Sequence, residues 1–344
     1  MESPAARLPA RTADPPATVQ RSSMRAIVHE RYGRPNLLEL RDVDKPTVED
    51  NQVLVRVHAS SVNPVEWYGV TGFLPARFGN GLRSPEDSSV GADLAGKVEA
   101  VGRDVTKFQP GDEVFGVSGS SWAEYTCARA DRLAPKPAGL SFEEAASVPV
   151  AGMTSLQALR DKGKVQPGQK VLINGASGGV GTFAVQLAKA FGAEVTGVCS
   201  TRNVEQARSL GADRVVDYTK EDFTKLDERY DLMLDIAGSR SFLDFRRVLT
   251  PEATVVSIGG RMTYRGLGPL PHLAGTIVKS WFRSQTVTFF VAEVTTDDLA
   301  FLGELFDAGR VKPVIDRRYE LSEAPEALAY LGQGHARAKV VITM

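Results

Sequence analysis

The sequence predicts an α/β protein of two domains, one made of short β-strands and the other of a doubly wound parallel sheet. Three observations predict this. The chain has 344 residues, more than a single hydrophobic core usually holds. Residues from Met24 to about Leu140 have the pattern of short strands and turns, whereas strand and helix patterns alternate from Lys170 onward. Alternating βαβ units predict a parallel sheet with helices on both faces.

Composition limits the partners that the chain can be expected to bind. The formal net charge is -1, which predicts no general attraction to nucleic acid or to an anionic membrane. No apolar run reaches the roughly 18 residues of a membrane helix. Only two cysteines occur, Cys127 and Cys199, so we expect no disulfide framework and a reducing, cytoplasmic location.

Residues 1–23 form a separate compositional zone, rich in Ala, Pro and Arg and without aromatic residues. They contain no apolar segment typical of a secretory signal. We expect a disordered tail, because such a composition buries too little apolar surface to fold. A transit peptide is the alternative, although four prolines and the acids Glu2 and Asp14 disfavour it.

The first domain is expected over residues 24–145. Residues 24–29 have a strand-like pattern. Residues 52–59 alternate, with three valines on one face and Arg56 and His58 on the other. Glycine and proline interrupt the pattern at 108–116, which predicts a small, irregular β domain.

The second domain is expected over residues 146–293. Ser141 and Glu144 have capping-box spacing and predict the start of an alanine-rich helix. Four apolar runs, at 171–174, 194–199, 231–235 and 254–258, predict strands, and 286–293 predicts a last one. Helical spacing from Val180 to Phe191 predicts a helix that ends at Gly192.

The C-terminal residues 294–344 are expected to return to the first domain and complete it. A helix over 297–308, a second helix from Ser322 and a closing strand over 339–344 are predicted there.

A glycine-rich turn predicts a dinucleotide site at Ala176–Gly181, between the strand at 171–174 and the following helix. The turn has the G-x-G-x-x-G pattern with alanine in the first position. Gly178 has no Cβ, so a pyrophosphate can approach the backbone, and Gly181 lets the helix pack close to the strand. The helix N-terminus directs N–H groups at the phosphates. The predicted contacts are Ala176, Ser177, Gly178, Gly179, Val180 and Gly181. The alternative is a tight turn that binds no ligand.

The end of the next strand predicts NADPH as the cofactor. NAD sites usually place an acid there, about 20 residues after the glycines, to bind the ribose 2′-hydroxyl. Here the strand ends at Cys199 and is followed by Ser200, Thr201 and Arg202. A hydroxyl and a guanidinium suit a 2′-phosphate. Alternatively, Arg202 is a solvent-exposed residue at the start of a helix and binds no phosphate.

From Met24 to the C-terminus the chain resembles the zinc-free quinone oxidoreductase branch of the medium-chain dehydrogenase/reductase superfamily. This branch includes zeta-crystallin-like proteins and mitochondrial-type 2-enoyl reductases. The resemblance rests on SVNP at 61–64, GADLAG at 91–96, FQPGDEVFG at 108–116, AEY at 123–125, VPVAGMTS at 148–155 and INGASGGVG at 173–181. It implies a GroES-like catalytic domain, a Rossmann domain, an active site between them and a homodimer formed through the Rossmann domain at 286–293.

The resemblance also implies roles for single residues. Tyr218 would join Ser200 and Arg202 at the adenosine phosphate, and Thr154 would lie near the cofactor. Gly259 and Phe290 complete the expected cofactor contacts. Asn63 and Tyr68 are the candidate catalytic residues. Each has an alternative: Asn-Pro is a common turn former, Tyr68 and Trp67 could be packing residues, and Tyr218 could pack on the sheet.

The zinc enzymes of the superfamily need a cysteine and a Gly-His-Glu in segments that here contain SSVNPVEWYG and GADLAG. We therefore expect no metal site. What remains is hydride delivery from NADPH to a polarised acceptor, either a quinone or the β-carbon of an α,β-unsaturated carbonyl. Phe73 stands where enoyl reductases of the family have a tyrosine, so enoyl-thioester reduction is not expected. We expect no histidine or cysteine to act as an acid or base. The alternative function is a non-catalytic, NADPH-binding crystallin-like or regulatory protein.

Overall fold

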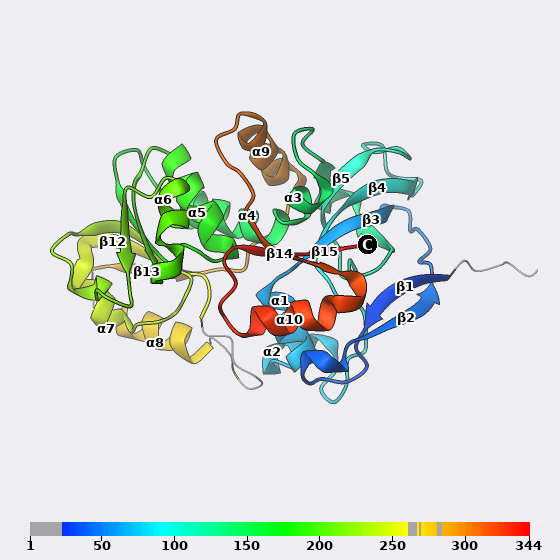
Figure 1. Ribbon diagram of the computed structural model, residues 1–344, viewed down its shortest axis with the longest axis horizontal. Helices are drawn as coiled ribbons and strands as arrows, with labels where there is room; N and C mark the ends of the chain where they lie inside the picture. The colour runs from blue at the N-terminus through cyan, green and yellow to red at the C-terminus, as the bar shows by residue number, and fades with distance from the viewer. Residues whose placement is uncertain (1–22, 261–266, 268–269, 281–283) are drawn as a thin grey trace, which may run out of the picture.

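The computed structural model describes residues 23–260, 267, 270–280 and 284–344. The predicted tail lies outside these residues, except that Ser23 begins the first strand. Figure 1 shows two lobes side by side, each built around its own sheet. A seven-stranded sheet forms one lobe and a six-stranded sheet the other, and a two-stranded ribbon accompanies the first. The predicted α/β fold class, with a GroES-like domain and a Rossmann-type parallel sheet, is confirmed.

The first sheet is mostly antiparallel and combines residues from both ends of the chain. Its strand order is β14-β15-β3-β4-β5-β7, with β6 paired to β3. The C-terminal strand therefore lies inside the sheet, antiparallel to β3 and parallel to β14. The ribbon is β1 (Ser23–Val28) and β2 (Glu39–Asp44); the sheet is β3 (Gln52–Val62), β4 (Asp93–Val101), β5 (Glu113–Val117), β6 (Tyr125–Arg129), β7 (Leu133–Pro135), β14 (Ile315–Glu320) and β15 (Lys339–Thr343).

Three helices, α1 (Pro64–Thr71), α2 (Leu74–Asn80) and α10 (Ala324–Gly332), accompany this sheet (Figure 1). Trp67 of α1 is buried in the same core cluster as Leu328 of α10. A Cβ at Gly332 would lie 2.0 Å from the Trp67 ring, so only glycine allows this approach. Trp67 is thus a packing residue, which was the alternative left open for it.

The second sheet is parallel throughout, with the order β10-β9-β8-β11-β12-β13. The strand order reverses between β8 and β11, and ligands of doubly wound sheets bind at such a switch point, outside the carboxyl ends of the strands. The strands are β8 (Lys170–Asn174), β9 (Glu194–Cys199), β10 (Arg214–Asp217), β11 (Tyr230–Asp235), β12 (Leu249–Ser257) and β13 (Thr286–Phe289); the helices are α5 (Gly179–Ala190), α6 (Val204–Ser209), α7 (Phe242–Phe245) and α8 (Leu270–Ser280).

The helices α3 (Phe142–Ala146), α4 (Pro149–Gln157) and α9 (Thr296–Asp307) lie between the two lobes in Figure 1. The capping box predicted for α3 is present: Ser141 Oγ accepts from the Glu144 N–H at 3.1 Å, and Glu144 Oε2 accepts from the Ser141 N–H at 2.9 Å. Short turns complete the chain: η1 (Pro35–Leu37), η2 (Ala130–Arg132), η3 (Ala158–Lys162, π-helical), η4 (Thr201–Asn203), η5 (Phe223–Lys225), η6 (Arg246–Val248) and η7 (Leu321–Glu323).

The structure differs from the sequence-based elements at some points. The strand β13 ends at Phe289, four residues before the predicted end. The helices α1 and α2 lie in the segment predicted to contain short strands and turns, and β10, β14 and α8 are among the elements that were not predicted. Within the described part of the chain, no helix is long and apolar enough to span a bilayer.

Candidate active site

The glycine-rich turn joins β8 to α5 at the switch point of the parallel sheet. The N–H groups of Gly175 and Ala176 both donate to the Val198 carbonyl at 3.1 Å, which ties the turn to β9. A Cβ at Gly181 would lie 2.1 Å from the Gly175 carbonyl oxygen, whereas a Cβ at Gly178 would meet only that oxygen, at 3.8 Å. Gly181 therefore permits the close approach of helix and turn, and Gly178 leaves open space in front of the helix N-terminus. A pyrophosphate fits this cradle.

The phosphate end of the site is organised by Asn203, a residue that sequence reasoning missed. Its Nδ2 donates to Ser177 Oγ at 3.0 Å and to Ser200 Oγ at 3.2 Å, so two predicted residues from different segments are brought together. Arg202 lies beside them, exposed, and donates to the His335 carbonyl at 2.7 Å. Tyr218 is 53% exposed, so about half of the residue is open to a ligand.

A second arginine, Arg337, reaches the same place from the C-terminal segment. Its Nε donates to Asn203 Oδ1 at 2.9 Å and its Nη2 to the Arg202 carbonyl at 3.2 Å. Arg337 is thus joined through Asn203 to the hydroxyls of Ser177 and Ser200, and guanidinium and hydroxyl donors of this kind suit a phosphate. No local pattern could have revealed Arg337, because its partners are more than 130 residues away in sequence.

The middle of the site lies between α4 and α5. Ser155 Oγ donates to the Val180 carbonyl at 2.8 Å and fixes α4 against the glycine-rich turn. The neighbouring Thr154 hydroxyl donates within its own helix, to Val150 at 2.7 Å. A Cβ at Gly179 would lie 3.0 Å from Cδ of Lys339, so this lysine of β15 passes directly over the helix start.

The remaining two predicted cofactor contacts have different surroundings. Gly259 follows β12, and a Cβ there would lie 2.7 Å from the Ile236 carbonyl oxygen, at the carboxyl edge of the sheet. Phe290 packs against the main core cluster, and Lys162 Nζ lies 5.7 Å from its ring centre.

Asn63 belongs to a buried polar network with Asp93 and Lys339. It is the N-cap of α1, as expected of a turn former, and forms a capping box with Glu66. Its side chain also reaches beyond the helix: Nδ2 donates to Asp93 Oδ2 at 3.0 Å, and Oδ1 accepts from Lys339 Nζ at 2.5 Å. Lys339 also donates to Asp93 Oδ2 at 3.2 Å. All three are almost inaccessible, with exposed fractions of 3%, 0% and 2% for Asn63, Asp93 and Lys339.

Glu66 adds a second buried carboxyl group next to this network. Its oxygens accept from the Asn63 N–H at 2.7 Å and from the Ala92 N–H at 2.9 Å. Burial, and then the nearby Asp93 charge, raise the pKa of Glu66 to about 7, although the hydrogen bond from the Asn63 N–H and the charge of Lys339 oppose the shift. The group therefore titrates close to neutrality.

Tyr68 is half-buried on α1. Its ring centre lies 5.0 Å from that of Phe73, the position where enoyl reductases have a tyrosine. Burial raises the pKa of the Tyr68 phenol, which keeps the hydroxyl protonated as a hydrogen-bond donor. Tyr68 also packs against the buried core cluster that contains Trp67, which supports the packing interpretation as well.

A histidine–carboxylate pair that was not expected lies at the carboxyl edge of the parallel sheet. His272 Nε2 is 3.0 Å from Oδ2 of the buried Asp235, whose other oxygen accepts from Asn174 Nδ2 at 2.8 Å and from the Gly238 N–H at 3.1 Å. That no histidine acts as an acid or base stays a prediction, because this contact alone assigns no catalytic role to His272. The two residues are 37 positions apart and form no motif.

The two cysteines and His58 lie in surroundings that favour the uncharged forms of their side chains. Burial raises the pKa of the Cys127 and Cys199 thiols to about 11. The His58 ring stacks on Phe142 with centres 4.3 Å apart, and burial lowers the pKa of His58. Across the residues that the structure describes, no three or more His, Cys, Asp or Glu side chains are grouped so as to hold a metal ion.

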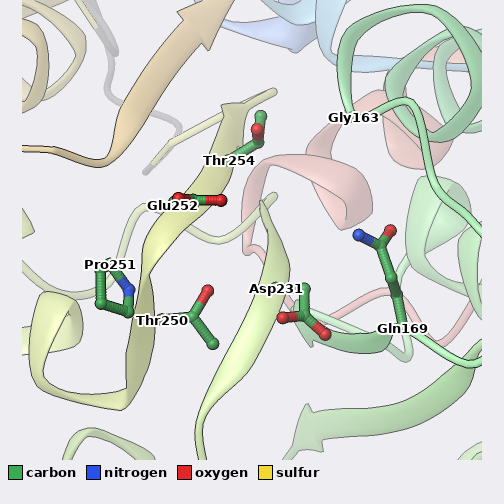
Figure 2. Close-up of a pocket in the computed structure, with 7 residues that line it drawn as sticks. All are labelled: Gly163, Gln169, Asp231, Thr250, Pro251, Glu252 and Thr254. Carbon is green, nitrogen blue, oxygen red and sulfur yellow. The ribbon is translucent and has the colours of Figure 1, made fainter.

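A surface hollow lies at the opposite, amino edge of the parallel sheet (Figure 2). Its lining comes from the starts of β11 and β12 and from the segment before β8, so it is separate from the glycine-rich turn. The lining residues are Gly163, Gln169, Asp231, Thr250, Pro251, Glu252 and Thr254. None is a predicted site residue.

Comparison with known proteins gives consistent matches over almost the whole chain. The alcohol dehydrogenase GroES-like domain family matches residues 49–138, and the zinc-binding dehydrogenase family matches residues 210–342. The mouse mitochondrial NAD(P)H oxidoreductase RTN4IP1 is 33% identical over 93% of this chain and 89% of its own. The tomato (Solanum lycopersicum) 2-methylene-furan-3-one reductase is 34% identical over 93% of this chain and 79% of its own. The quinone oxidoreductase from Coxiella burnetii is 32% identical, with a TM-score of 0.83 over 94% of this chain and 100% of its own.

Proposed function

Since the chain belongs to the quinone oxidoreductase branch of the medium-chain dehydrogenase/reductase superfamily, we propose that it transfers hydride from NADPH to a quinone or an α,β-unsaturated carbonyl without a metal ion. The observation that carries the proposal is the position of Lys339. It joins the glycine-rich turn, through Gly179, to the buried Asn63. The Lys339 side chain therefore spans the space between the glycine-rich turn, which would hold the phosphates, and Asn63, the candidate catalytic residue.

The chain's own residues divide the work of holding the cofactor. The turn from Ala176 to Gly181 would hold the pyrophosphate, with the first N–H groups of α5 and the Gly178 opening. Ser200, Arg202 and Arg337 would hold the 2′-phosphate by charge-assisted hydrogen bonds. NADPH, when bound, supplies the hydride, so the chain itself has to orient the acceptor and exclude water.

Hydrogen-bond donors are what the chain can offer to the acceptor. The oxygen of an enone or quinone gains negative charge during reduction, and a fixed donor stabilises it. The Asn63 amide and the protonated Tyr68 hydroxyl are donors of this kind on the same helix. Metal independence is supported by the donor set, because serine and alanine stand in segments where zinc enzymes carry cysteine and histidine.

The test is a panel of acceptors offered to metal-analysed protein, with loss of NADPH absorbance as the signal. Reduction of benzoquinones, naphthoquinones or simple enones by protein with substoichiometric zinc is the expected result. NADPH binding without turnover of any acceptor would instead support the non-catalytic, crystallin-like alternative. One tightly held zinc per chain would contradict metal independence.

We further propose a homodimer located in the cytoplasm, with no nucleic acid or membrane as partner. The dimer is supported by β13, which is the edge strand of its sheet and carries the exposed Phe289, followed closely by the exposed Val291. An uncovered strand of this kind tends to pair with a second copy.

A further inference from the structure

We propose that Lys339 and Asp93 are positioning residues that hold the Asn63 amide as a hydrogen-bond donor to the oxygen of the acceptor. The inference rests on the proposed function. It assigns to the C-terminal strand a role in the chemistry that no motif of the sequence indicates.

The two bonds to Asn63 fix which way its amide faces. A lysine ammonium has only donors and a carboxylate has only acceptors. Oδ1 therefore has to face Lys339, at 2.5 Å, and Nδ2 has to face Asp93, at 3.0 Å. If the amide were rotated by 180°, Nδ2 would face the Lys339 ammonium, a donor against a donor, and Oδ1 would face the Asp93 carboxylate, an acceptor against an acceptor. Buried polar groups left without partners in this way cost free energy.

This orientation decides what Asn63 can give to a ligand. Its carbonyl oxygen is occupied by Lys339, while Nδ2 has a second hydrogen for which the described residues provide no acceptor. Because only 3% of the Asn63 surface is exposed, a ligand can reach it with no more than about one atom. Asn63 can thus donate to a single oxygen of an acceptor.

Asp93 is itself held rigidly. Its Oδ2 accepts from Ser61 Oγ at 2.5 Å in addition to Asn63 and Lys339, and its Oδ1 accepts from the Val150 N–H at 2.8 Å. These donors come from β3, β15 and the start of α4, so the carboxylate cannot turn without breaking bonds to several elements.

Lys339 also offsets the negative charge of Asp93 next to the Asn63 amide. A buried carboxylate beside the amide would repel the negative charge that develops on the acceptor oxygen, and its effect is strong where little water is present. The ammonium of Lys339, 3.2 Å from Asp93, offsets that charge. It also polarises the Asn63 amide through Oδ1, which makes the N–H a better donor.

The experiment measures an oxyanion mimic rather than turnover. We expect 4-nitrophenolate to bind the NADP⁺ complex of the wild type, followed by its absorbance shift. Lys339→Met should weaken this binding about 10- to 100-fold, as for the loss of a hydrogen bond to a charged group, and Asn63→Ala should do the same. NADP⁺ affinity should change less than about threefold, because the lost interaction is with the acceptor.

A double-mutant cycle separates positioning from general damage. If Lys339 acts through Asn63, the double variant Asn63→Ala/Lys339→Met binds 4-nitrophenolate no more weakly than either single variant. The matched control is Lys97→Met, which removes an exposed lysine from the same sheet that pairs with Glu113 at 3.4 Å. It should bind like the wild type. If Lys339→Met fails to fold, Asp93→Asn/Lys339→Met removes both charges and should show the same loss.

Three results would overturn the inference: no 4-nitrophenolate binding by the wild type, unchanged binding after Lys339→Met, or additive effects in the cycle. A large loss of NADP⁺ affinity in Lys339→Met with 4-nitrophenolate binding intact would make Lys339 a phosphate ligand instead. None of these results concerns the proposed reduction itself, which the acceptor panel tests separately.

Discussion

Arg337 Nε donates a 2.9 Å hydrogen bond to Oδ1 of Asn203, and through it the segment before the last strand is joined to the start of α6. Asn203 donates in turn to Ser177 and Ser200. The phosphate end of the proposed cofactor site is therefore built from three segments far apart in sequence. Binding and mutagenesis can test it directly.

We expect Arg202→Ala to lower NADPH affinity about 10- to 100-fold and to leave NADH affinity unchanged. One charge-assisted hydrogen bond to a phosphate contributes about 1.5–3 kcal/mol, and NADH has no 2′-phosphate. Titration by nucleotide fluorescence measures both affinities. Arg208→Ala, which removes an exposed arginine paired with Glu205, is the matched control. Equal wild-type affinities for the two cofactors would contradict the preference.

Two glycines of the same turn should respond differently to substitution. Gly178→Val should abolish dinucleotide binding with little loss of stability, because its side chain would enter the open space meant for the pyrophosphate. Gly181→Ala should lower the free energy of unfolding by about 1–3 kcal/mol, because its Cβ would overlap the Gly175 carbonyl. Nucleotide titration and urea unfolding distinguish the two effects. A Gly178→Val protein that still binds NADPH would disprove the location of the cradle.

Glu66 should make the free energy of unfolding depend on pH. Its pKa in the folded protein is raised from 4.5 to about 7, so the folded state holds this proton more tightly than the unfolded state. The resulting stabilisation is complete below pH 4.5 and is lost as the pH rises through about 7. Urea unfolding of wild type and Glu66→Gln across this window should show a wild-type stability that falls relative to the variant.

The control for that comparison is Glu205→Gln, which neutralises an acid whose side chain is 84% exposed. Its unfolding free energy should follow the wild type across the same pH range. Parallel curves for wild type and Glu66→Gln would show that folding does not raise the pKa of Glu66.

Ala338→Gly should stabilise the protein by about 1 kcal/mol. Ala338 has a φ of 135°, a backbone conformation that residues with a Cβ rarely adopt and that costs about 1–3 kcal/mol. Glycine removes this strain, but it loses more conformational entropy on folding, which cancels part of the gain. Thermal and urea unfolding measure the change. Ala336→Gly, two residues earlier and without a positive φ, should be destabilising instead. A destabilised Ala338→Gly would show that this backbone is not strained.

Light scattering should give about twice the monomer mass of 37.1 kDa at micromolar concentration. Phe289→Lys should lower the mass to that of the monomer, because it places a charge on the edge strand proposed to pair with a second copy. Phe78→Lys changes another exposed phenylalanine, on α2, and should remain dimeric. A monomeric wild type would refute the dimer.

The fold could be predicted from the sequence where structure is local. The strands β8, β9, β11 and β12 are buried apolar runs, and the α3 capping box lies within four residues. The strand β14 was missed because its residues are mostly polar and none is fully buried, so it has neither an apolar run nor an alternation. The helix α8 was missed because its sequence, LPHLAGTIVKS, contains both proline and glycine.

The candidate site was predictable only in its glycine-rich part. Ala176 to Gly181 form one contiguous motif, whereas Lys339 and Arg337 reach the site from the end of the chain. Asp93 was visible within GADLAG, but its bonds to Ser61, Asn63, Val150 and Lys339 depend on long-range pairing of strands. Such meetings are set by topology, which a sequence pattern does not express.

The position of β15 inside the first sheet determines when that sheet can be completed during synthesis. Its partner β3 is translated early, yet residues 340–343 can pair with residues 59–62 only after all the residues between them have been made. The Rossmann strands, from β8 to β13, are all translated before it. The nucleotide-binding half can therefore form while the protein is still being made, but Asn63 acquires Lys339 only after every Rossmann strand has been translated.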